Sequence, residues 1–191
     1  MSALEVKIAQ LRTLLREMGE VVICFSGGVD SSYLLAESVQ VLGKRATALT
    51  AVSPSLAPEE GAGARRLAEQ LGARHILDET NEVDDPRYAA NPVNRCYFCK
   101  AELFSRMNAL AAERGIAAIA YGENADDPAD LRPGSRAAAE FAVLAPLKQA
   151  DLTKADVRHL SKIYGLPTAD SAAQPCLSSR IPHGTPVTSE A

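Results

Sequence analysis

The 191-residue sequence has no apolar run that approaches the length of a membrane-spanning segment, which predicts a soluble protein. Its first residues, Met-Ser-Ala-Leu-Glu-Val-Lys, lack the charged start and continuous apolar stretch of a signal peptide. The two absences together predict a cytoplasmic protein. Internal repeats and low-complexity tracts are also missing. The length and the hydrophobic content of 47% are those of one ordinary globular domain, with room for a small appendage.

Long runs of Lys and Arg are absent as well, and the formal net charge is −4. Non-specific binding of nucleic acid needs a clustered basic surface. We therefore expect no nucleic-acid partner, although this composition still allows a local basic pocket.

The Gly-Lys-Ser/Thr end of a Walker loop does not occur, yet a different phosphate-binding signal lies near the N-terminus. Apolar residues 21–25 predict a buried strand, residues 26–31 read Ser-Gly-Gly-Val-Asp-Ser, and residues 33–39 have a helical pattern. Gly27 and Gly28 can adopt backbone angles closed to other residues and let the main chain approach a phosphate. Free N–H groups of the first helical turn would point at this anion. Three hydroxyl groups add further donors, those of Ser26, Ser31 and Ser32.

Strands and helices alternate along the first half of the chain, which predicts right-handed βαβ units and a parallel sheet. Apolar runs predict further strands at residues 46–52, 74–77 and 116–121. Periodic patterns and their end signals predict helices up to residue 18, at 58–71 and at 96–114. The predicted fold class is α/β, a doubly wound parallel sheet with helices on both faces.

Ligands of such sheets bind outside the carboxyl ends of the strands. Gly27 and Gly28 follow one predicted strand there, and Gly122-Glu123-Asn124 follow another. The polar, proline-containing segment 78–94 predicts a long functional or mobile loop.

One helix of the second half has well-defined ends. Thr153 can act as its N-cap, and Asp156 can complete a capping box. Leu152 and Val157 can form a hydrophobic staple, and Gly165 supplies the stop.

Four cysteines in a chain of this kind favour metal binding or catalysis over disulfides. Cys24 lies inside the apolar strand and is predicted to be buried and inert. Cys96 and Cys99 form Cys-Tyr-Phe-Cys, a pair compatible with redox chemistry, half a zinc site or iron–sulfur ligation. Cys176 lies in a turn-rich stretch near Arg180, and a neighbouring cation is expected to lower the pKa of a thiol.

The cysteine pattern leaves two metal sites open. Structural zinc takes four ligands, which would be Cys96, Cys99, Cys176 and His183. A [4Fe–4S] cluster with one open iron would need only the three cysteines.

Ser-Gly-Gly-x-Asp-Ser resembles the pyrophosphate loop of the N-type ATP pyrophosphatases, which cut ATP between the α- and β-phosphates and leave AMP on a substrate oxygen. Further motifs follow in order, namely Asn-Arg-Cys-Tyr-Phe-Cys-Lys at 94–100, Gly-Glu-Asn-Ala-Asp-Asp at 122–127, Arg-Pro-Gly at 132–134, Leu-Thr-Lys at 152–154 and Pro-Cys-Leu-Ser-Ser-Arg-Ile-Pro at 175–182. With these motifs the whole chain resembles the LarE-type sulfur transferases. These enzymes use ATP to thiolate pyridinium-3,5-biscarboxylic acid mononucleotide, a step toward the nickel-pincer cofactor of lactate racemase.

The resemblance implies an ATP site made of Ser26, Gly27, Gly28, Asp30, Ser31, Ser32, Asn124 and Asp127. It also implies Mg²⁺ between phosphate oxygens at Asp30 or Asp127. Asp126 belongs to the same strand-end segment. The competing interpretation of residues 124–127 is a plain polar turn. The competing interpretation of Asp30 is a negative charge that stabilises a helix N-terminus.

Two sulfur routes follow from the resemblance. In the sacrificial route the Cys176 thiolate attacks the acyl-adenylate, and cleavage of its Cβ–S bond leaves dehydroalanine. In the other, Cys96, Cys99 and Cys176 ligate a [4Fe–4S] cluster that delivers hydrosulfide, which the Cys-x-x-Cys pair favours. Arg180 would activate Cys176 or bind a substrate phosphate.

The predicted organisation is a nucleotide domain at residues 1–150 and the start of a C-terminal sulfur-transfer segment at 151–191. Members of the family continue beyond this point, with a segment that helps to bind substrate and to build a homo-oligomer. Three alternatives stay open: a tRNA thiolase of the same superfamily, an amidotransferase-type ligase such as a GMP or NAD synthetase, and a zinc-stabilised module that senses AMP or ATP without catalysis.

Overall fold

The computed structural model describes residues 2–127, 133–172 and 176–188. Four strands form one parallel sheet in the order β3-β2-β1-β4. Their bounds are β1 Val21–Cys24, β2 Ala46–Val52, β3 Arg74–Glu79 and β4 Ala118–Tyr121. The chain builds outward from β1 to β3 and then returns to place β4 on the other side of β1. The doubly wound parallel sheet is therefore confirmed.

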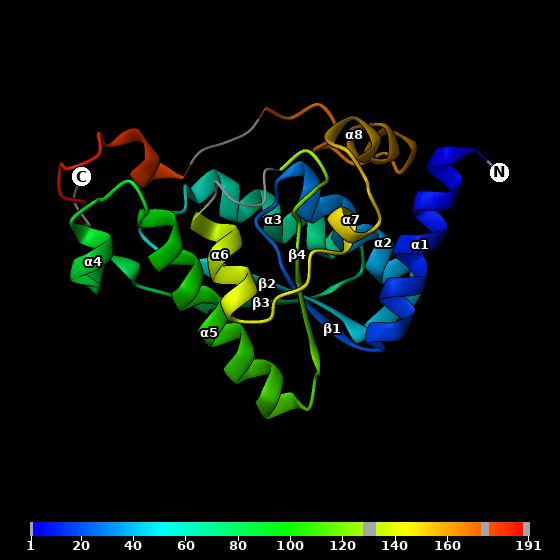
Figure 1. Cartoon of the computed structure of the whole chain (residues 1–191), viewed down its shortest axis with the longest axis horizontal. Coiled ribbons are helices and arrows are strands. Elements are labelled where there is room, and N and C mark those ends of the chain that lie inside the picture. The colour runs from blue at the N-terminus through cyan, green and yellow to red at the C-terminus, as the bar shows by residue number, and fades with distance from the viewer. Residues whose placement is uncertain (1, 128–132, 173–175, 189–191) are drawn as a thin grey trace.

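Helices cover both faces of this sheet (Figure 1). They are α1 Ala3–Met18, α2 Val29–Leu42, α3 Pro58–Gln70, α4 Pro86–Ala89, α5 Arg95–Arg114, α6 Pro133–Glu140, α7 Pro146–Gln149 and α8 Lys154–Ile163. Alternate residues of β1 enter two different cores, because successive side chains of a strand point to opposite faces. Val21 and Ile23 pack with α1, α2 and α3, whereas Val22 and Cys24 pack with α5 and α6.

The second-half helix begins as its sequence predicts. The Thr153 hydroxyl accepts a hydrogen bond from the Asp156 amide, and the Asp156 carboxylate accepts one from the Thr153 amide. Leu152 and Val157 are both fully buried in the core that α8 shares with α2, and Gly165 has a φ of +65°. The capping box and the glycine stop are thus confirmed. The boundary between residues 150 and 151 stays a prediction.

Segment 78–94 is more ordered than the long loop expected from its sequence. Strand β3 continues to Glu79, a 3₁₀ turn follows at Glu82–Asp84, and α4 comes next. Asp85 caps α4 by accepting a hydrogen bond from the Arg87 amide, and Pro86 occupies the first helical position. The segment expected as one long loop therefore contains a short helix, which the Asp-Pro pair starts, and its functional role stays a prediction.

The segment from Cys176 to Thr188 lies beside α4, far from α1 (Figure 1). It contains one 3₁₀ turn, Leu177–Arg180. The Val187 amide donates to the Ala89 carbonyl at 2.9 Å, which ties the segment to the end of α4. Among the described residues, no helix combines the length and apolarity that spanning a membrane requires.

Candidate active site

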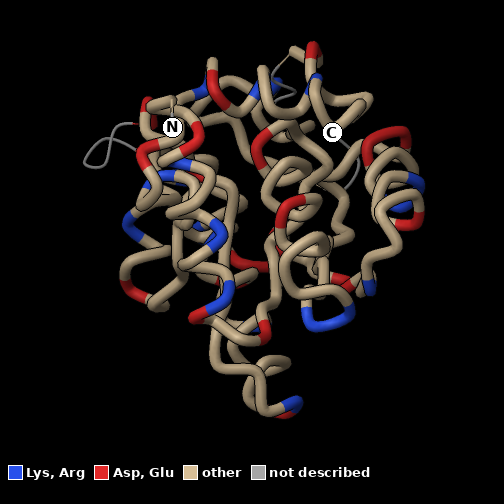
Figure 2. Tube along the Cα trace, turned by 90° about the vertical axis from the view of Figure 1, so that its right-hand side faces the viewer, with Lys and Arg blue, Asp and Glu red and all other residues tan. Residues whose placement is uncertain are grey.

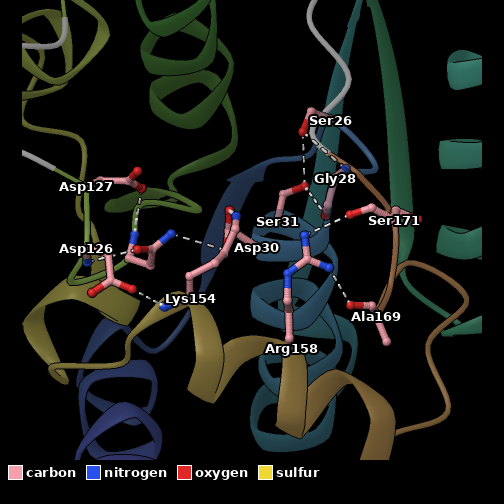
Figure 3. Close-up of polar contacts among 11 residues, drawn as sticks. Ser26, Gly28, Asp30, Ser31, Asp126, Asp127, Lys154, Arg158, Ala169 and Ser171 are labelled. Atoms are coloured by element: carbon pink, nitrogen blue, oxygen red, sulfur yellow. Dashed lines mark hydrogen bonds and ion pairs between the residues drawn. The ribbon is translucent and has the colours of Figure 1, made fainter.

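The loop between β1 and α2 is shaped by its own serine hydroxyls (Figure 3). The oxygens of Ser26 and Ser31 lie 3.1 Å apart, and the Ser31 hydroxyl donates to the Gly28 carbonyl at 3.1 Å. Gly28 is the N-cap residue of α2, and no side chain caps that end. The first N–H groups of α2 are therefore open to an anion, as the sequence predicts.

The two loop glycines have different roles. Gly27 has a φ of +76°, and a Cβ added there would lie 3.2 Å from Cβ of Ala64 on α3. Gly28 has an ordinary extended φ of −75°, and its added Cβ would meet only the Ser26 hydroxyl, at 3.4 Å. Only Gly27 therefore uses the backbone freedom that the sequence offers at both glycines.

The Ser32 side chain is fully buried, and its hydroxyl makes no hydrogen bond to another described residue. The Ser32 amide donates to the Gly28 carbonyl within the first turn of α2. The contact of Ser32 with ATP therefore stays a prediction. The hydroxyls of Ser26 and Ser31, in contrast, line the loop itself.

A second loop meets the first one at Asp30. Asn124, just beyond β4, donates its side-chain N–H to Asp30 at 3.3 Å. Lys154, the first residue of α8, places its ammonium 2.5 Å from the other Asp30 oxygen (Figure 3). The Asp126 carboxylate accepts a hydrogen bond from the Lys154 amide at 2.8 Å, and Asp127 accepts one from the Asn124 amide at 3.1 Å. The predicted site residues of the two loops are thus brought together.

Lys154 was not among the predicted site residues. The sequence identifies Lys154 only as the last residue of the Leu-Thr-Lys motif, and that motif does not predict a contact with Asp30. The structure does so because α8 packs on α2 and directs its first residue toward the N-terminal end of α2. Lys154 supplies a cation beside the anion site.

Gly122 determines how closely the two loops approach each other. A Cβ added there would lie 2.7 Å from the Ser31 nitrogen and 2.9 Å from the Asp30 carbonyl carbon. Both are backbone atoms, and displacing them would require a shift of α2 or β4. The end of β4 therefore presses against the first turn of α2, at the point where the strand order reverses and where such sheets bind ligands.

Magnesium needs few protein ligands, because it retains waters and binds substrate phosphates. Asp30 lies in the first turn of α2, and Asn124 donates hydrogen bonds to both Asp30 and Asp127, so these two carboxylates are the candidate ligands. Asp30 is already paired with Lys154, and Mg²⁺ would compete with that ammonium.

The cysteines predicted to hold a metal lie in one region of the molecule. Cys96 and Cys99 belong to the first turns of α5, where Cys96 is exposed and Cys99 is half-buried. Burial raises the pKa of Cys99 to about 12, with smaller contributions from the Glu82 carboxylate and the thiols of Cys176 and Cys96. Cys24 is buried in β1 as predicted, with the Lys100 ammonium 3.8 Å from its sulfur.

The three thiols are neighbours without forming a ligand set. Within the described ranges, no three His, Cys, Asp or Glu side chains are close enough to hold a metal ion. His183 is exposed and does not complete a zinc site there. The described thiols therefore do not form a preassembled [4Fe–4S] or zinc site, and both metal sites remain predictions.

The cation that contacts the Cys176 turn is Arg95 rather than Arg180. The Arg180 side chain is exposed. Arg95 is 3% exposed, and its guanidinium donates to the Ser178 carbonyl at 2.7 Å and to the Ser179 hydroxyl at 3.1 Å. The Cys176 sulfur lies 3.1 Å from that same hydroxyl. Sequence reasoning missed Arg95, although it directly precedes Cys96.

One family match and two solved structures have the same type of fold. Residues 9–94 match the asparagine synthase family. The structure resembles an NMN synthetase from Francisella tularensis, with a TM-score of 0.67 and 20% identity over 91% of this chain and 76% of that one. It also resembles an NH₃-dependent NAD synthetase from Campylobacter jejuni, with a TM-score of 0.65 and 16% identity over 87% of this chain and 75% of that one. At these identities the likeness shows the fold alone.

Sequence relatives are more specific. An uncharacterized protein of Synechocystis sp. is 46% identical over 98% of this chain and 70% of its own length. The pyridinium-3,5-bisthiocarboxylic acid mononucleotide synthase of Lactiplantibacillus plantarum is 36% identical over 98% of this chain and 68% of its own length. By its likeness to this synthase, this chain belongs to the LarE-type family of the N-type ATP pyrophosphatase superfamily.

Proposed function

We propose that this chain is an ATP-dependent sulfur transferase that converts the carboxylates of pyridinium-3,5-biscarboxylic acid mononucleotide to thiocarboxylates. The observation that carries the proposal is the 36% identity to a synthase named for this product. The uncapped N-terminus of α2 and the turn that contains Cys176 supply groups that such a reaction needs. The product would enter the biosynthesis of a nickel-pincer nucleotide cofactor.

The first step activates the substrate. A carboxylate resists attack because its leaving group would be oxide. A substrate carboxylate oxygen attacks the α-phosphorus of ATP, the bond to the β-phosphate oxygen breaks, and pyrophosphate leaves with the electron pair. The N–H groups at the start of α2 and the hydroxyls of Ser26 and Ser31 would stabilise the charge growing on pyrophosphate. Lys154 lies close enough to the same loop to add a positive charge.

The second step transfers sulfur. A sulfur nucleophile attacks the acyl carbon, and AMP leaves with the bonding electrons. We place this step at Cys176, the thiol that both sulfur routes share. In the sacrificial route the thioester then loses its Cα proton, the Cβ–S bond breaks toward sulfur, and dehydroalanine remains. Arg180, exposed on the same turn, would bind a substrate phosphate or activate the thiol.

The test is to incubate the chain with ATP, Mg²⁺ and the pyridinium biscarboxylate. We expect AMP and pyrophosphate as nucleotide products, and a substrate that carries sulfur in place of oxygen by mass spectrometry. ADP as the product would contradict the loop assignment. Binding of ATP without pyrophosphate release would favour the nucleotide-sensing module. The mass of the Cys176 peptide after one turnover separates the two sulfur routes, since dehydroalanine forms in only one.

The alternative of a tRNA thiolase makes a different prediction. In Figure 2, Lys and Arg positions along the described trace are interleaved with Asp and Glu positions. With a net charge of −4, we expect no tRNA binding at moderate salt. Tight association that weakens steeply with added salt would support the thiolase instead.

A further inference from the structure

Arg95 is a buried cation bonded to neutral groups. It is 3% exposed, and its guanidinium donates to the Asn91 side-chain oxygen at 2.5 Å as well as to Ser178 and Ser179. It also lies over the Tyr88 ring, 5.9 Å from the centroid. No carboxylate pairs with it among the described residues. Burying a charge is costly unless its donors are satisfied, so these bonds to the Cys176 turn hold Arg95 and the turn together.

Asn91 extends this attachment. It is fully buried and has a φ of +51°, an uncommon conformation for a residue other than glycine. Its side-chain nitrogen donates to the carbonyls of Pro182 and Thr185, each at 2.9 Å, and its own carbonyl accepts from the Gly184 amide at 3.0 Å. The left-handed backbone at Asn91 thus directs both its side chain and its main chain at the segment after Cys176.

A group of three buried hydroxyls closes the other side of the turn. The hydroxyl of Ser178 lies 2.7 Å from that of Ser55 and 2.8 Å from that of Tyr88. The Leu177 amide donates to the Ser55 carbonyl at 3.0 Å. The residues that hold the Cys176 turn are therefore Ser55, Tyr88, Asn91 and Arg95. These four residues come from two segments far earlier in the chain: Arg95 precedes Ser178 by 83 positions, and Tyr88 precedes it by 90.

We propose that Arg95 is a positioning residue for sulfur transfer, a role that rests on the proposed function. A guanidinium only donates hydrogen bonds, so the Ser179 oxygen accepts from Arg95. The Ser179 hydroxyl proton is then free to point at the Cys176 sulfur, 3.1 Å from that oxygen. Arg95 fixes the turn through the Ser178 carbonyl and orients the hydroxyl that faces the thiol. Because it is also the first residue of α5, it couples the Cys176 turn to the helix that carries Cys96 and Cys99.

The test compares Arg95→Met, which keeps the stem but removes the donors, with Arg95→Lys, which keeps the charge and one point of attachment. Arg106→Met is the matched control, since Arg106 lies on the same helix and pairs at the surface with Asp78. Hydrogen exchange is followed by mass spectrometry on peptides covering 176–188 and on β1. Pyrophosphate release and thiolated product are measured on the same samples.

We expect Arg95→Met to accelerate exchange of the 176–188 peptides about tenfold or more, which corresponds to about 1.4 kcal/mol of lost attachment. Exchange in β1 and pyrophosphate release should stay within about twofold of the parent, while thiolated product falls about tenfold or more. Arg95→Lys should lie in between, and Arg106→Met should match the parent.

Three results would overturn the positioning role. The first is unchanged hydrogen exchange of the 176–188 peptides in Arg95→Met. The second is parental formation of thiolated product although these peptides exchange faster. The third is a parallel change in β1 exchange, pyrophosphate release and thiolated product, which indicates general destabilisation. If the parent itself releases no pyrophosphate with the pyridinium substrate, the proposed function fails, and the exchange data still decide whether Arg95 holds the turn.

Discussion

At the residue scale, residues of the same type differ in their physical roles. Gly27 makes the turn of the pyrophosphate loop, whereas Gly28 has ordinary extended angles. Arg95 is buried against the Cys176 turn, whereas Arg180, which belongs to the turn, is exposed. Substitutions at such positions separate the roles.

The Gly27 turn predicts a strong effect of a single methyl group. Gly27→Ala forces a side chain into a left-handed conformation, at a cost of roughly 1–2 kcal/mol, and brings its Cβ within 3.2 Å of Ala64. We expect urea unfolding to show that loss, and pyrophosphate release to fall about tenfold or more as the loop shifts. Gly63→Ala on α3 is the control, because the space around Gly63 is open apart from an Arg66 nitrogen at 4.0 Å. Equal activity of the two variants would contradict the loop geometry.

The Cys99 thiol makes a prediction about pH. Burial disfavours the thiolate and raises the pKa of Cys99 to about 12, so the folded protein keeps the proton at neutral pH. Alkylation of Cys99 by iodoacetamide should therefore keep accelerating about tenfold for each pH unit up to pH 10. In denaturant, the rate should level off near the ordinary thiol pKa of about 8.5. A plateau below pH 9 in the folded protein would show that Cys99 is not buried as described.

At the scale of elements, the site depends on contacts between the ends of β1, β4, α2 and α8. Strand β4 lies beside β1, which places Gly122 against the first turn of α2. Helix α8 brings Lys154 to Asp30 from the far half of the chain. The site is therefore sensitive to the spacing between elements as well as to its own side chains.

Gly122→Ala tests this spacing. Its Cβ would fall 2.7 Å from the Ser31 nitrogen, so β4 or α2 must shift. Forcing extra volume into a packed site costs typically about 1–3 kcal/mol. We expect that loss in urea unfolding, together with weaker ATP binding measured by calorimetry. Parental ATP affinity in a stable Gly122→Ala protein would show that the close approach has no role in the site.

Thr153→Ala tests the start of α8. Loss of the N-cap hydroxyl should cost about 1 kcal/mol, since the Asp156 amide loses its acceptor. The measurement is the urea midpoint at an unchanged slope. Thr153→Ser keeps the hydroxyl and should behave like the parent, and equal losses in both variants would point to the methyl group instead of the cap.

At the scale of the whole molecule, the three cysteines predicted to bind a metal lie on two segments, and these segments would have to move closer to form a metal site. The predicted [4Fe–4S] cluster implies that anaerobically prepared protein contains about four iron atoms and inorganic sulfide. Cys96→Ser, Cys99→Ser and Cys176→Ser should each remove the iron, whereas Cys24→Ser should not. Loading should fall at low pH, because the ligands are thiolates. Zinc without sulfide would support the structural-zinc alternative, and iron retained in Cys176→Ser would separate Cys176 from the ligands.

The sequence alone determined the elements whose signals are local. The apolar run before Ser-Gly-Gly-Val-Asp-Ser predicted β1, the Thr153–Asp156 pair predicted the start of α8, and alternation predicted the doubly wound sheet. It also identified the loop that opens toward an anion. These features depend on residues a few positions apart, so the pattern of the chain is sufficient to specify them.

Only the tertiary structure decided which distant groups meet. Lys154 reaches Asp30 across 124 positions, and Arg95 reaches the Ser178 carbonyl across 83. It also left the three thiols without a common metal centre within the described ranges. No local pattern encodes such pairings, because they follow from how helices pack on a sheet and how a buried charge finds its acceptors.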